Sequence, residues 1–567
     1  MRKAMRLHPV VRDVRGEVRK DICMTVEQGE AYRFTLHHHG DEEVRLGEAI
    51  VAVLEYPADT PFFGEGYNML SMYGGTLANP RLTGACHDRD HYRMPQTPGA
   101  FLVYNLLELQ TPEGYDVYGF STCERFRGEF RLYPDRVEIC QALEGVRLAP
   151  GGTLELEELT VADGGSLSEA YRPLRAAIEK RYPMRVSPVE PMGWCSWYCY
   201  GLDIDKDILA RTMTDIRQKA PELKIVQIDD GYEKHMGDWL DESDKLGAPA
   251  SALCRDMADG GFIPGIWAAP FTAEKDSRLF REHPDWFIQD EDGGPLSADK
   301  VTYPGWRAGP WVMLDGSHPD ARQYLHDVFT VMSRDWGCRY FKLDANTWGA
   351  LPFGKHYLED CTSIQAYRMG MAAILDAIGE DSFVLGCNAP LWATLGLVNG
   401  MRVSTDIDRN WPIVRQVAHE CLHRQYQHGS FWINDPDCCV VQGEALTEEE
   451  KRFHLAYQMA VGGVKMVSDR IGDWSLEESY QTQLFLATQV KDLAFLEADR
   501  SVAVGMTGDG EEIAFFFNST DQPVERRLEQ PGNSRWTEIW TNEEAQADGC
   551  LPVQLPPHAA RVYIRQK

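Results

Sequence analysis

Tyr340-Phe341-Lys342-Leu343-Asp344 is a short apolar stretch that ends in a carboxylate. The segment 401–406, Met-Arg-Val-Ser-Thr-Asp, has the same plan. Parallel strands are buried on both faces, so an ionisable group at the carboxyl end of one is placed for binding or chemistry rather than for packing. Two such carboxylates point to glycoside hydrolysis, a reaction that uses a pair of them.

Apolar segments of similar length recur on both sides of this pair, separated by longer amphipathic stretches. Strands that alternate with helices are typical of βα units and of a parallel sheet. Eight such units fit a (β/α)8 TIM barrel with insertions better than a doubly wound sheet, because no Gly-x-Gly-x-x-Gly turn opens any of them. The expected strands are 192–197, 224–228, 263–268, 339–343, 383–387, 401–404, 431–434 and 464–468.

We expect the barrel at residues 191–494. The sequence on either side of it has a different pattern of apolar and turn-forming residues. Residues 1–165 contain short β-rich runs between Gly and Pro turns, a pattern typical of an antiparallel β-sandwich. A helical connector is expected at 166–190, where apolar residues recur at helical spacing up to Pro183. Residues 495–567 return to β-rich runs and predict a small C-terminal antiparallel β domain, a sandwich.

The net charge of the chain limits the kinds of molecule that we expect it to bind. Fifty-seven Lys and Arg face 87 Asp and Glu, a formal charge of −30 that would repel nucleic acid and acidic lipid. No apolar run approaches the ~20 residues that span a bilayer. The basic start runs into Pro9 without the apolar core of a signal peptide, so we expect a cytoplasmic protein with a neutral substrate. Its 14 cysteines form no C-x-x-C pair of the kind found in zinc and redox sites. We also expect no cofactor.

The residues at the carboxyl ends of the expected strands would surround one barrel mouth, where active sites of this fold lie. Carboxylates, a few cations and tryptophans suit a pyranose, because hydroxyls bind charged groups and the apolar ring face stacks on an indole. The candidates are Trp194, Trp197, Asp229, Asp230, Trp267, Lys342, Asp344, Cys387, Asn388, Arg402 and Asp406.

Asp344 and Asp406 are the expected catalytic pair. Lys342 lies two residues before Asp344 and projects to the same side of the strand, where its charge would keep Asp344 ionised and nucleophilic. Asp406 follows a polar segment, and partial burial against Trp411 would raise its pKa towards that of a general acid. Asp408 is as close in sequence and remains an alternative acid at this point.

Other patterns have structural explanations beside the functional ones. The tryptophans Trp194, Trp197 and Trp267 are also able to fill the barrel. For Asp435-Pro436-Asp437 a helix cap is the favoured interpretation. His419-Glu420-Cys421-Leu422-His423 matches the zinc-peptidase pattern H-E-x-x-H, but it falls on the outer helix after the sixth strand and lacks a clear third ligand. We therefore expect no metal.

At these residues the chain resembles glycoside hydrolase family 36, the bacterial α-galactosidases of clan D. Three of the segments that carry the resemblance are Gly-Trp-Cys-Ser-Trp at 193–197, Gln-Ile-Asp-Asp-Gly-Tyr at 227–232 and Gly-Ile-Trp-Ala-Ala-Pro-Phe at 265–271. The segments 385–387 and 401–406 are similar to the family's fifth and sixth strand ends. The resemblance covers nearly the whole chain and implies a retaining exo-α-galactosidase that needs no cofactor.

The resemblance also implies a role for each site residue. Asp344 would be the nucleophile, and Asp406 the acid/base, because the family's acid stands four residues after the Arg. The implied substrate contacts are Asp229 and Asp230 at O4 and O6, Lys342 at hydroxyls beside the nucleophile, Cys387 and Arg402 near O2, and Trp194 and Trp267 along the pocket.

Asn388 departs from the family, in which Gly often follows the Cys. This side chain would approach the C2 substituent, so an α-N-acetylgalactosaminidase or α-galactosaminidase is the main alternative, and a β-L-arabinopyranosidase a third. A catalytically silent glycan-binding protein is the non-enzyme alternative. Family members also form multimers in which the N-terminal domain reaches a neighbouring active site, and Gly64-Glu65-Gly66-Tyr67-Asn68 is the segment expected to do so.

Overall fold

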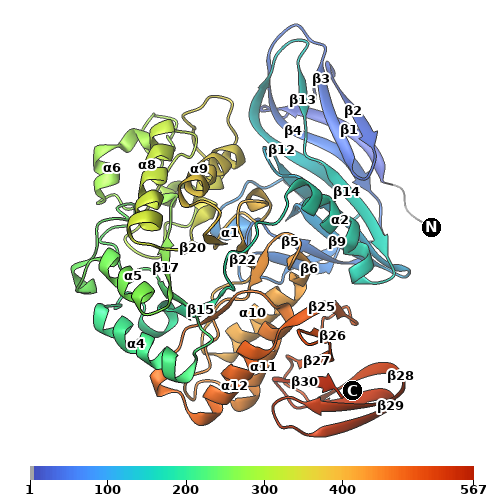
Figure 1. Cartoon of the computed structure of the whole chain (residues 1–567). Coiled ribbons are helices and arrows are strands. Elements are labelled where there is room, and N and C mark those ends of the chain that lie inside the picture. The colour runs from blue at the N-terminus through green and yellow to red at the C-terminus, as the bar shows by residue number, and fades with distance from the viewer. Residues whose placement is uncertain (1–4, 567) are drawn as a thin grey trace.

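A parallel eight-stranded barrel forms the centre of the molecule (Figure 1). The computed structural model describes residues 5–566. The barrel strands are β15 (Met192–Cys195), β16 (Ile225–Ile228), β17 (Ile263–Ala268), β20 (Tyr340–Leu343), β21 (Phe383–Gly386), β22 (Gly400–Arg402), β23 (Ile433–Asp435) and β24 (Lys465–Val467). All eight expected strands are present, most of them shorter than expected.

The sheet runs β23-β22-β21-β20-β17-β16-β15-β24, so the first and last barrel strands, β15 and β24, pair in parallel. At the remaining gap, Val464 N donates to Asn434 O at 2.9 Å, which joins the ends of β24 and β23. The barrel is therefore nearly closed, and the carboxyl ends of its strands meet at one mouth.

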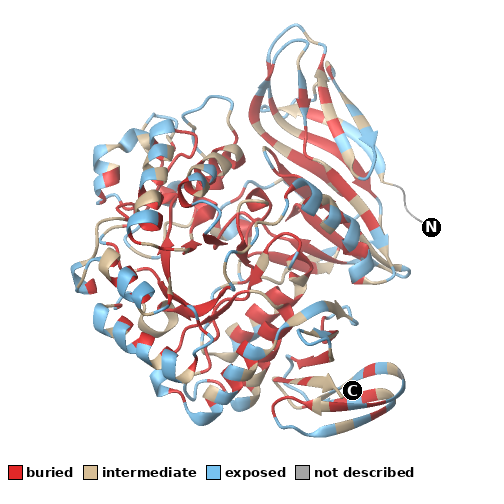
Figure 2. Cartoon of the chain, in the orientation of Figure 1, coloured by how far each residue is buried: buried red, intermediate tan, exposed pale blue. Residues whose placement is uncertain are grey.

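Helices surround the barrel and bury one face each against it, as the red inner and blue outer faces in Figure 2 show. Several begin with the side-chain caps that satisfy free N–H groups. Thr362 with Gln365, and Ser475 with Glu478, form capping boxes at two of them. The helices of eight or more residues in this ring are α4 (Lys206–Lys219), α5 (Ala250–Asp259), α8 (Pro319–Thr330), α9 (Ser363–Ile378), α10 (Trp411–His423), α11 (Glu448–Val461) and α12 (Leu476–Ala487).

The connection between β17 and β20 is the longest of the barrel. It holds the two-stranded sheet β18 (Thr272–Ala273) and β19 (Val312–Met313) and the short helices α6 (Arg278–Glu282) and α7 (Ala298–Val301). We name residues 269–339 the β17–β20 insertion. Part of it returns to the barrel mouth, as described below.

Two antiparallel sheets precede the barrel, as the sequence predicts. The helix α2 (Leu167–Arg181) follows them, capped by Ser166, and packs on the larger sheet. The smaller sheet contains β1 (Arg6–Asp13), β4 (Val44–Leu54), β12 (Val137–Leu148), β11 (Arg127–Leu132) and β8 (Phe101–Tyr104). The larger contains β13 (Thr153–Glu155), β3 (Tyr32–His38), β2 (Ile22–Gln28), β14 (Leu159–Gly164), β10 (Gly114–Phe120), β9 (Leu106–Thr111), β5 (Pro61–Glu65), β6 (Met72–Thr76) and β7 (Asn79–Leu82).

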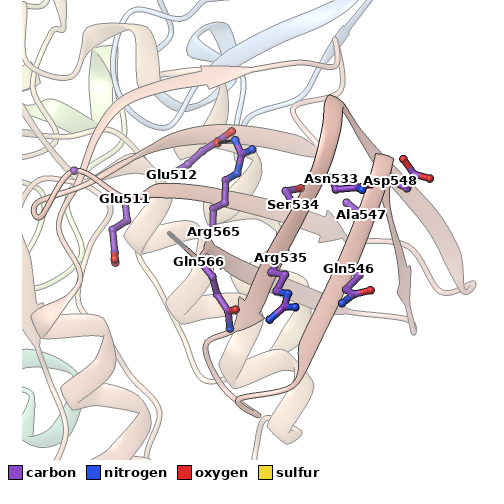
Figure 3. Close-up of a pocket in the computed structure, with 11 residues that line it drawn as sticks. Glu511, Glu512, Asn533, Ser534, Arg535, Gln546, Ala547, Asp548, Arg565 and Gln566 are labelled. Carbon is purple, nitrogen blue, oxygen red and sulfur yellow. Dashed lines mark hydrogen bonds and ion pairs between the residues drawn. The ribbon is translucent and has the colours of Figure 1, made fainter.

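The C-terminal strands form a single six-stranded antiparallel sheet, where the sequence suggested a sandwich. A hollow of about 1080 Å³ lies on this sheet, between residues 510–512 and the long strands, and its walls are mostly polar (Figure 3). It holds none of the residues expected at the barrel mouth. The strands are β25 (Val490–Phe495), β26 (Val502–Thr507), β27 (Glu512–Asn518), β28 (Val524–Glu538), β29 (Glu544–Leu555) and β30 (Ala559–Arg565).

Within residues 5–566, no helix has both the length and the apolar character needed to cross a bilayer.

Candidate active site

A cavity of about 480 Å³ opens at the carboxyl ends of the barrel strands. Eight of the eleven residues expected at the barrel mouth line it, and these are Trp197, Asp229, Asp230, Trp267, Lys342, Asp344, Asn388 and Asp406. The barrel therefore brings together side chains that lie far apart in the chain. The other three, Trp194, Cys387 and Arg402, are buried around the cavity and are not part of its lining.

Asp344 stands directly after β20 and is held by two N–H donors. Trp267 Nε1 donates to its Oδ2 at 3.2 Å, and the backbone N of Ala345 donates to its Oδ1 at 2.7 Å. Ala345 has a φ of +51°, a strained conformation for alanine that turns the chain sharply away after the carboxylate. The turn fixes Asp344 at the cavity wall with lone pairs left for a ligand.

Asp406 faces the same cavity from the loop after β22. Its side chain is 65% exposed, and this surface faces the cavity. The pKa of Asp406 is raised to about 6, chiefly because its recessed position removes water from the carboxylate. Arg402 lowers this pKa, and the charges of Asp437 and Asp344 raise it.

The guanidinium of Arg402 is surrounded by three carboxylates, one of which is Asp406. It contacts Asp406 at 3.1 Å, Asp435 at 3.2 Å and Asp437 at 2.7 Å. The resemblance implied a contact with the substrate near O2, but this buried guanidinium is not part of the cavity lining. Of its three carboxylate partners, Asp406 lines the cavity, whereas Asp435 and Asp437 do not. Asp435 and Asp437, which we interpreted as a helix cap, instead pair with this buried arginine.

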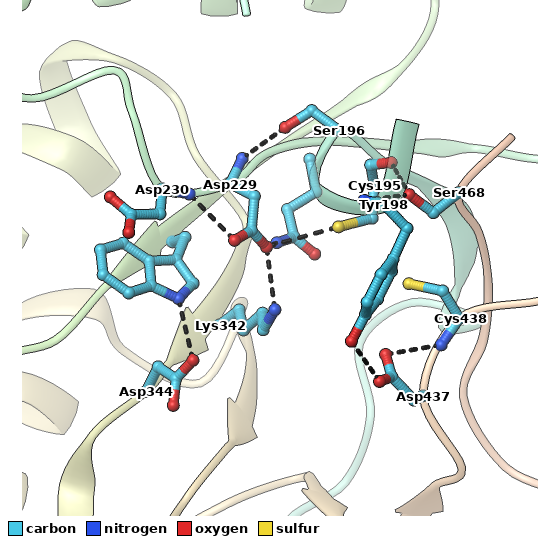
Figure 4. Close-up of polar contacts among 12 residues, drawn as sticks. Cys195, Ser196, Tyr198, Asp229, Asp230, Lys342, Asp344, Asp437, Cys438 and Ser468 are labelled. Carbon is cyan, nitrogen blue, oxygen red and sulfur yellow. Dashed lines mark hydrogen bonds and ion pairs between the residues drawn. The ribbon is translucent and has the colours of Figure 1, made fainter. Parts of the chain in front are cut away.

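Lys342 does not pair with Asp344, contrary to our expectation. Its ammonium donates to Asp229 Oδ2 at 2.9 Å, and both side chains are buried (Figure 4). The same Asp229 carboxylate also accepts from Gln227 Nε2 at 2.6 Å. Lys342 and Asp344 both face the cavity, as predicted from their spacing on the strand. However, the carboxylate that pairs with Lys342 is Asp229, which follows the neighbouring strand β16.

Asp230 is engaged by two residues that sequence analysis missed. Arg307 donates to both oxygens of Asp230, with Nη2 at 2.7 Å from Oδ1, and Trp306 Nε1 donates to Oδ2 at 3.2 Å. Arg307 also contacts Glu233 and, at 3.0 Å, Glu274. Both missed residues belong to the β17–β20 insertion, where no strand-end pattern marks them.

Aromatic side chains form much of the remaining wall. Trp267 lines the cavity as expected, together with Trp197, Tyr198, Tyr303, Trp306 and Trp348. Trp194 does not, because its indole is fully buried and donates to the carbonyl of Asp469 at 3.0 Å. For Trp194 the structural explanation, a side chain that fills the barrel, is therefore the right one.

The N-terminal region completes the cavity of the same chain. Met69, Leu70 and His91 line it. The buried ion pair between Glu65 and Arg424, at 2.9 Å, fixes the preceding segment to the barrel. The segment that we expected to reach a neighbouring subunit thus contacts its own barrel.

The alternatives raised by the sequence are resolved by contacts. Asp408 is exposed and does not line the cavity, so Asp406 is the better placed of the two. Trp411, which we expected to bury Asp406, is not part of the cavity lining and stacks on His558 with ring centroids 4.2 Å apart.

The H-E-x-x-H motif lies on α10, as expected. His423 Nδ1 contacts the carbonyl of His419 at 2.9 Å, and Glu420 accepts from Thr405 N at 2.6 Å and from Gln416 Nε2 at 2.9 Å. The carboxylate is therefore directed towards the barrel loop. Among residues 5–566 no group of three His, Cys, Asp or Glu is arranged to hold a metal.

Comparisons with known proteins agree with this geometry. Residues 165–382 match the melibiase family model. The bifunctional α-galactosidase/sucrose kinase AgaSK of Mediterraneibacter gnavus is 26% identical over 243 residues, 40% of this chain and 24% of that protein. The A type blood α-D-galactosamine galactosaminidase of Flavonifractor plautii is 24% identical over 341 residues, 56% of this chain and 30% of that protein. The chain thus spans about a quarter to a third of the length of these relatives.

A solved structure shares the whole fold. The GH36 α-galactosidase AgaA of Geobacillus stearothermophilus superposes with a TM-score of 0.67 at 13% identity, covering 98% of this chain and 89% of that one. A variant of AgaA has been solved in complex with raffinose. Part of the chain is therefore similar to the melibiase family, over the first half of the barrel, and the fold as a whole is similar to that of AgaA.

Proposed function

We propose that this protein is a retaining exo-α-galactosidase of glycoside hydrolase family 36, with Asp344 as nucleophile and Asp406 as acid/base. One observation carries the proposal: the two carboxylates face one cavity in different environments. Asp406 has its pKa raised to about 6, which suits a proton donor near neutral pH. Asp344 accepts hydrogen bonds from Trp267 and Ala345, which hold its carboxylate at the cavity wall.

The chemistry follows from this pair in two displacements. In the first, an oxygen of Asp344 bonds to the anomeric carbon while the bond to the leaving oxygen breaks, and Asp406 gives its proton to that oxygen. In the second, Asp406 removes a proton from water, and the water oxygen displaces Asp344 from the anomeric carbon. Each displacement inverts the carbon, so the released sugar keeps the α configuration.

The charges of the cavity disfavour an anionic sugar. Carboxylates outnumber cations along its lining, with Asp229, Asp230, Asp344 and Asp406 against Lys342 and Arg307. Trp267 offers an indole for the apolar face of a pyranose. The proposed substrate is therefore a terminal α-linked galactose on an oligosaccharide such as raffinose, cleaved without a cofactor.

The stereochemistry of the product tests the proposal. Proton NMR of p-nitrophenyl α-galactoside hydrolysis should show α-galactose first and the β anomer only later, by mutarotation. Early β-galactose would indicate a single displacement and would remove the nucleophile role of Asp344.

Azide separates the two carboxylates. Asp344→Gly leaves room for azide to attack in place of the nucleophile, so it should yield β-galactosyl azide. Asp406→Gly still forms the covalent intermediate, so azide should yield the α product. The same anomer from both variants would contradict the assignment, and no hydrolysis of any glycoside by the unmodified protein would favour a silent glycan-binding protein.

A further inference from the structure

Another cavity, of about 370 Å³, lies between α10 and the C-terminal sheet (Figure 1). Its lining comes from residues between 415 and 423 on α10, from Phe453 on α11, and from residues between 499 and 526 of the C-terminal region. We name it the α10 pocket. It shares no lining residue with the cavity that holds Asp344 and Asp406. A ligand bound in the α10 pocket would therefore leave the barrel mouth free.

The charged residues of the α10 pocket are mostly cations. Arg415, Arg500 and Arg526 line it, against a single acidic residue, Asp499, among the described residues. The whole chain carries a formal charge of −30, so this concave surface is opposite in sign to the average of the protein. A cleft lined by charges of one sign concentrates their field. The α10 pocket should therefore attract anions.

The three arginines differ in how far the protein neutralises them. Arg500 is buried and pairs at 3.1 Å with Glu108, which lies outside the lining. Arg526 contacts Asp499 at 3.3 Å through one nitrogen, Nη2. Arg415 is exposed and forms no ion pair with any of residues 5–566. The described part of the chain therefore leaves at least one full positive charge in the pocket unbalanced.

The histidines of α10 lie in the same positive potential. Burial lowers the pKa of His419 to about 4, and nearby cations lower it further, namely Arg500, Arg424, Arg81 and Arg415. The pKa of His423 is also lowered well below its usual value, by burial first and then by His419 and Arg500. Both imidazoles are therefore uncharged near neutral pH. A position that disfavours a further cation favours an anion.

Two polar atoms of the lining residues are buried without a hydrogen-bond partner within residues 5–566. They are Ser501 Oγ and Arg526 Nε, and Ser501 is only 5% exposed. Buried polar groups are nearly always paired, so these atoms point to a partner that the chain itself does not supply. Both are able to donate a hydrogen bond, which is what the oxygens of an anion accept.

We propose that the α10 pocket binds the phosphoryl group of a small polyol phosphate, such as a sugar phosphate. A phosphoryl group carries up to two negative charges, and its oxygens match the planar donors of a guanidinium. The volume lies at the lower end of the range for small-molecule sites, which leaves room for more than the phosphoryl group. Gln416, Ser519 and Thr520 also line the pocket, and their amide and hydroxyl groups suit the hydroxyls of the polyol.

Isothermal titration calorimetry with glucose 6-phosphate tests the inference, with inorganic phosphate and glucose titrated under the same conditions. Ionic strength is held constant, because salt screens exposed charges. Glucose 6-phosphate should bind saturably, inorganic phosphate should bind more weakly, and glucose should not bind detectably. Equal binding of glucose and glucose 6-phosphate would overturn the inference, and so would the lack of saturable binding of either phosphate.

Arginine substitutions test whether this binding takes place in the α10 pocket. Arg415→Gln and Arg526→Gln each remove one charge and its donors, so each should weaken the binding of glucose 6-phosphate by about tenfold or more. Arg255→Gln makes the same charge change at an exposed position of α5, outside the pocket, and is the matched control. The melting temperature without ligand checks that each variant is folded. Equal affinities in all three variants would overturn the inference.

Discussion

Arg402 reaches Asp406 with one guanidinium nitrogen at 3.1 Å, while Asp435 and Asp437 hold the rest of the guanidinium in the buried wall. The backbone N of Ile407, the residue after Asp406, donates to Asp437 at 2.8 Å. The proposed acid is thus positioned by a buried arginine and by a carboxylate that holds both the arginine and the loop. Its protonation depends on the balance between these charges.

The first prediction concerns the pH profile of the unmodified protein. The pKa of Asp406 is raised to about 6, and a general acid must carry its proton at the start of the reaction. We therefore expect kcat/KM for a substrate with a poor leaving group to fall as pH rises through about 6. A profile that stays flat up to pH ~8 would contradict the role of Asp406.

The second prediction is that Asp437→Asn moves this alkaline limb to lower pH. The charge of Asp437 raises the pKa of Asp406, and its removal also leaves Arg402 less neutralised, so both effects lower that pKa. Asp408→Asn is the matched control, because Asp408 is exposed nearby and outside the cavity lining. Equal profiles for the two variants would mean that Asp437 has only a structural role.

The third prediction concerns the nucleophile. Asp344→Ala should lower kcat for p-nitrophenyl α-galactoside by at least about 10³-fold, since the covalent step disappears. The folded state should survive, because the donors to this side chain within residues 5–566 are Trp267 and Ala345, and both remain able to bind water. A thermal unfolding scan checks the second point, and retained turnover would contradict the first.

The sequence correctly predicted the features that depend on a single strand and the residues at its carboxyl end. Parallel strands must be apolar, and their carboxyl ends must meet at one mouth, so Asp344, Asp406 and Asp229 were placed together without a structure. The same argument could not say how deep a side chain lies. Trp194 and Arg402 stand at strand ends, yet both point into the wall and not into the cavity.

Contacts between site residues and residues far away in the chain could not be predicted from the sequence for a related reason. Arg307 reaches Asp230 from a connection of about seventy residues, and Asn68 reaches Asn388 across 320 positions. Neither contact follows from a period or a motif, because each depends on how a loop or a separate sheet docks on the barrel. These partners of the expected site residues could therefore be found only in the structure.

The fourth prediction concerns Arg307. Its guanidinium pairs with Asp230, Glu233 and Glu274, so Arg307→Met would remove the cation that these three crowded carboxylates share. Of the three, Glu274 would keep its contact with His235 at 2.8 Å. We expect a lower melting temperature, from a loss of about 2–4 kcal/mol in the free energy of unfolding, and a raised KM because the insertion no longer closes on Asp230. Arg281→Met, an exposed position of the same insertion, is the matched control and should change neither.

The fifth prediction concerns Glu420 of the H-E-x-x-H motif. Burial raises the pKa of Glu420 to about 7 in the folded protein, from an ordinary value of 4.5. The folded state therefore binds this proton more tightly than the unfolded state does. The resulting stability is fully present below about pH 4.5 and is lost as pH rises through about 7.

Glu420→Gln cannot titrate, so its melting temperature should decline less than that of the unmodified protein between about pH 5 and pH 8. Asp406 titrates in both proteins and cancels in the comparison. A zinc peptidase would behave differently, since a chelator should then abolish activity and lower the melting temperature of the unmodified protein alone. We expect both quantities to be insensitive to chelation, because Glu420 is occupied by Thr405 and Gln416 and His423 by its own helix.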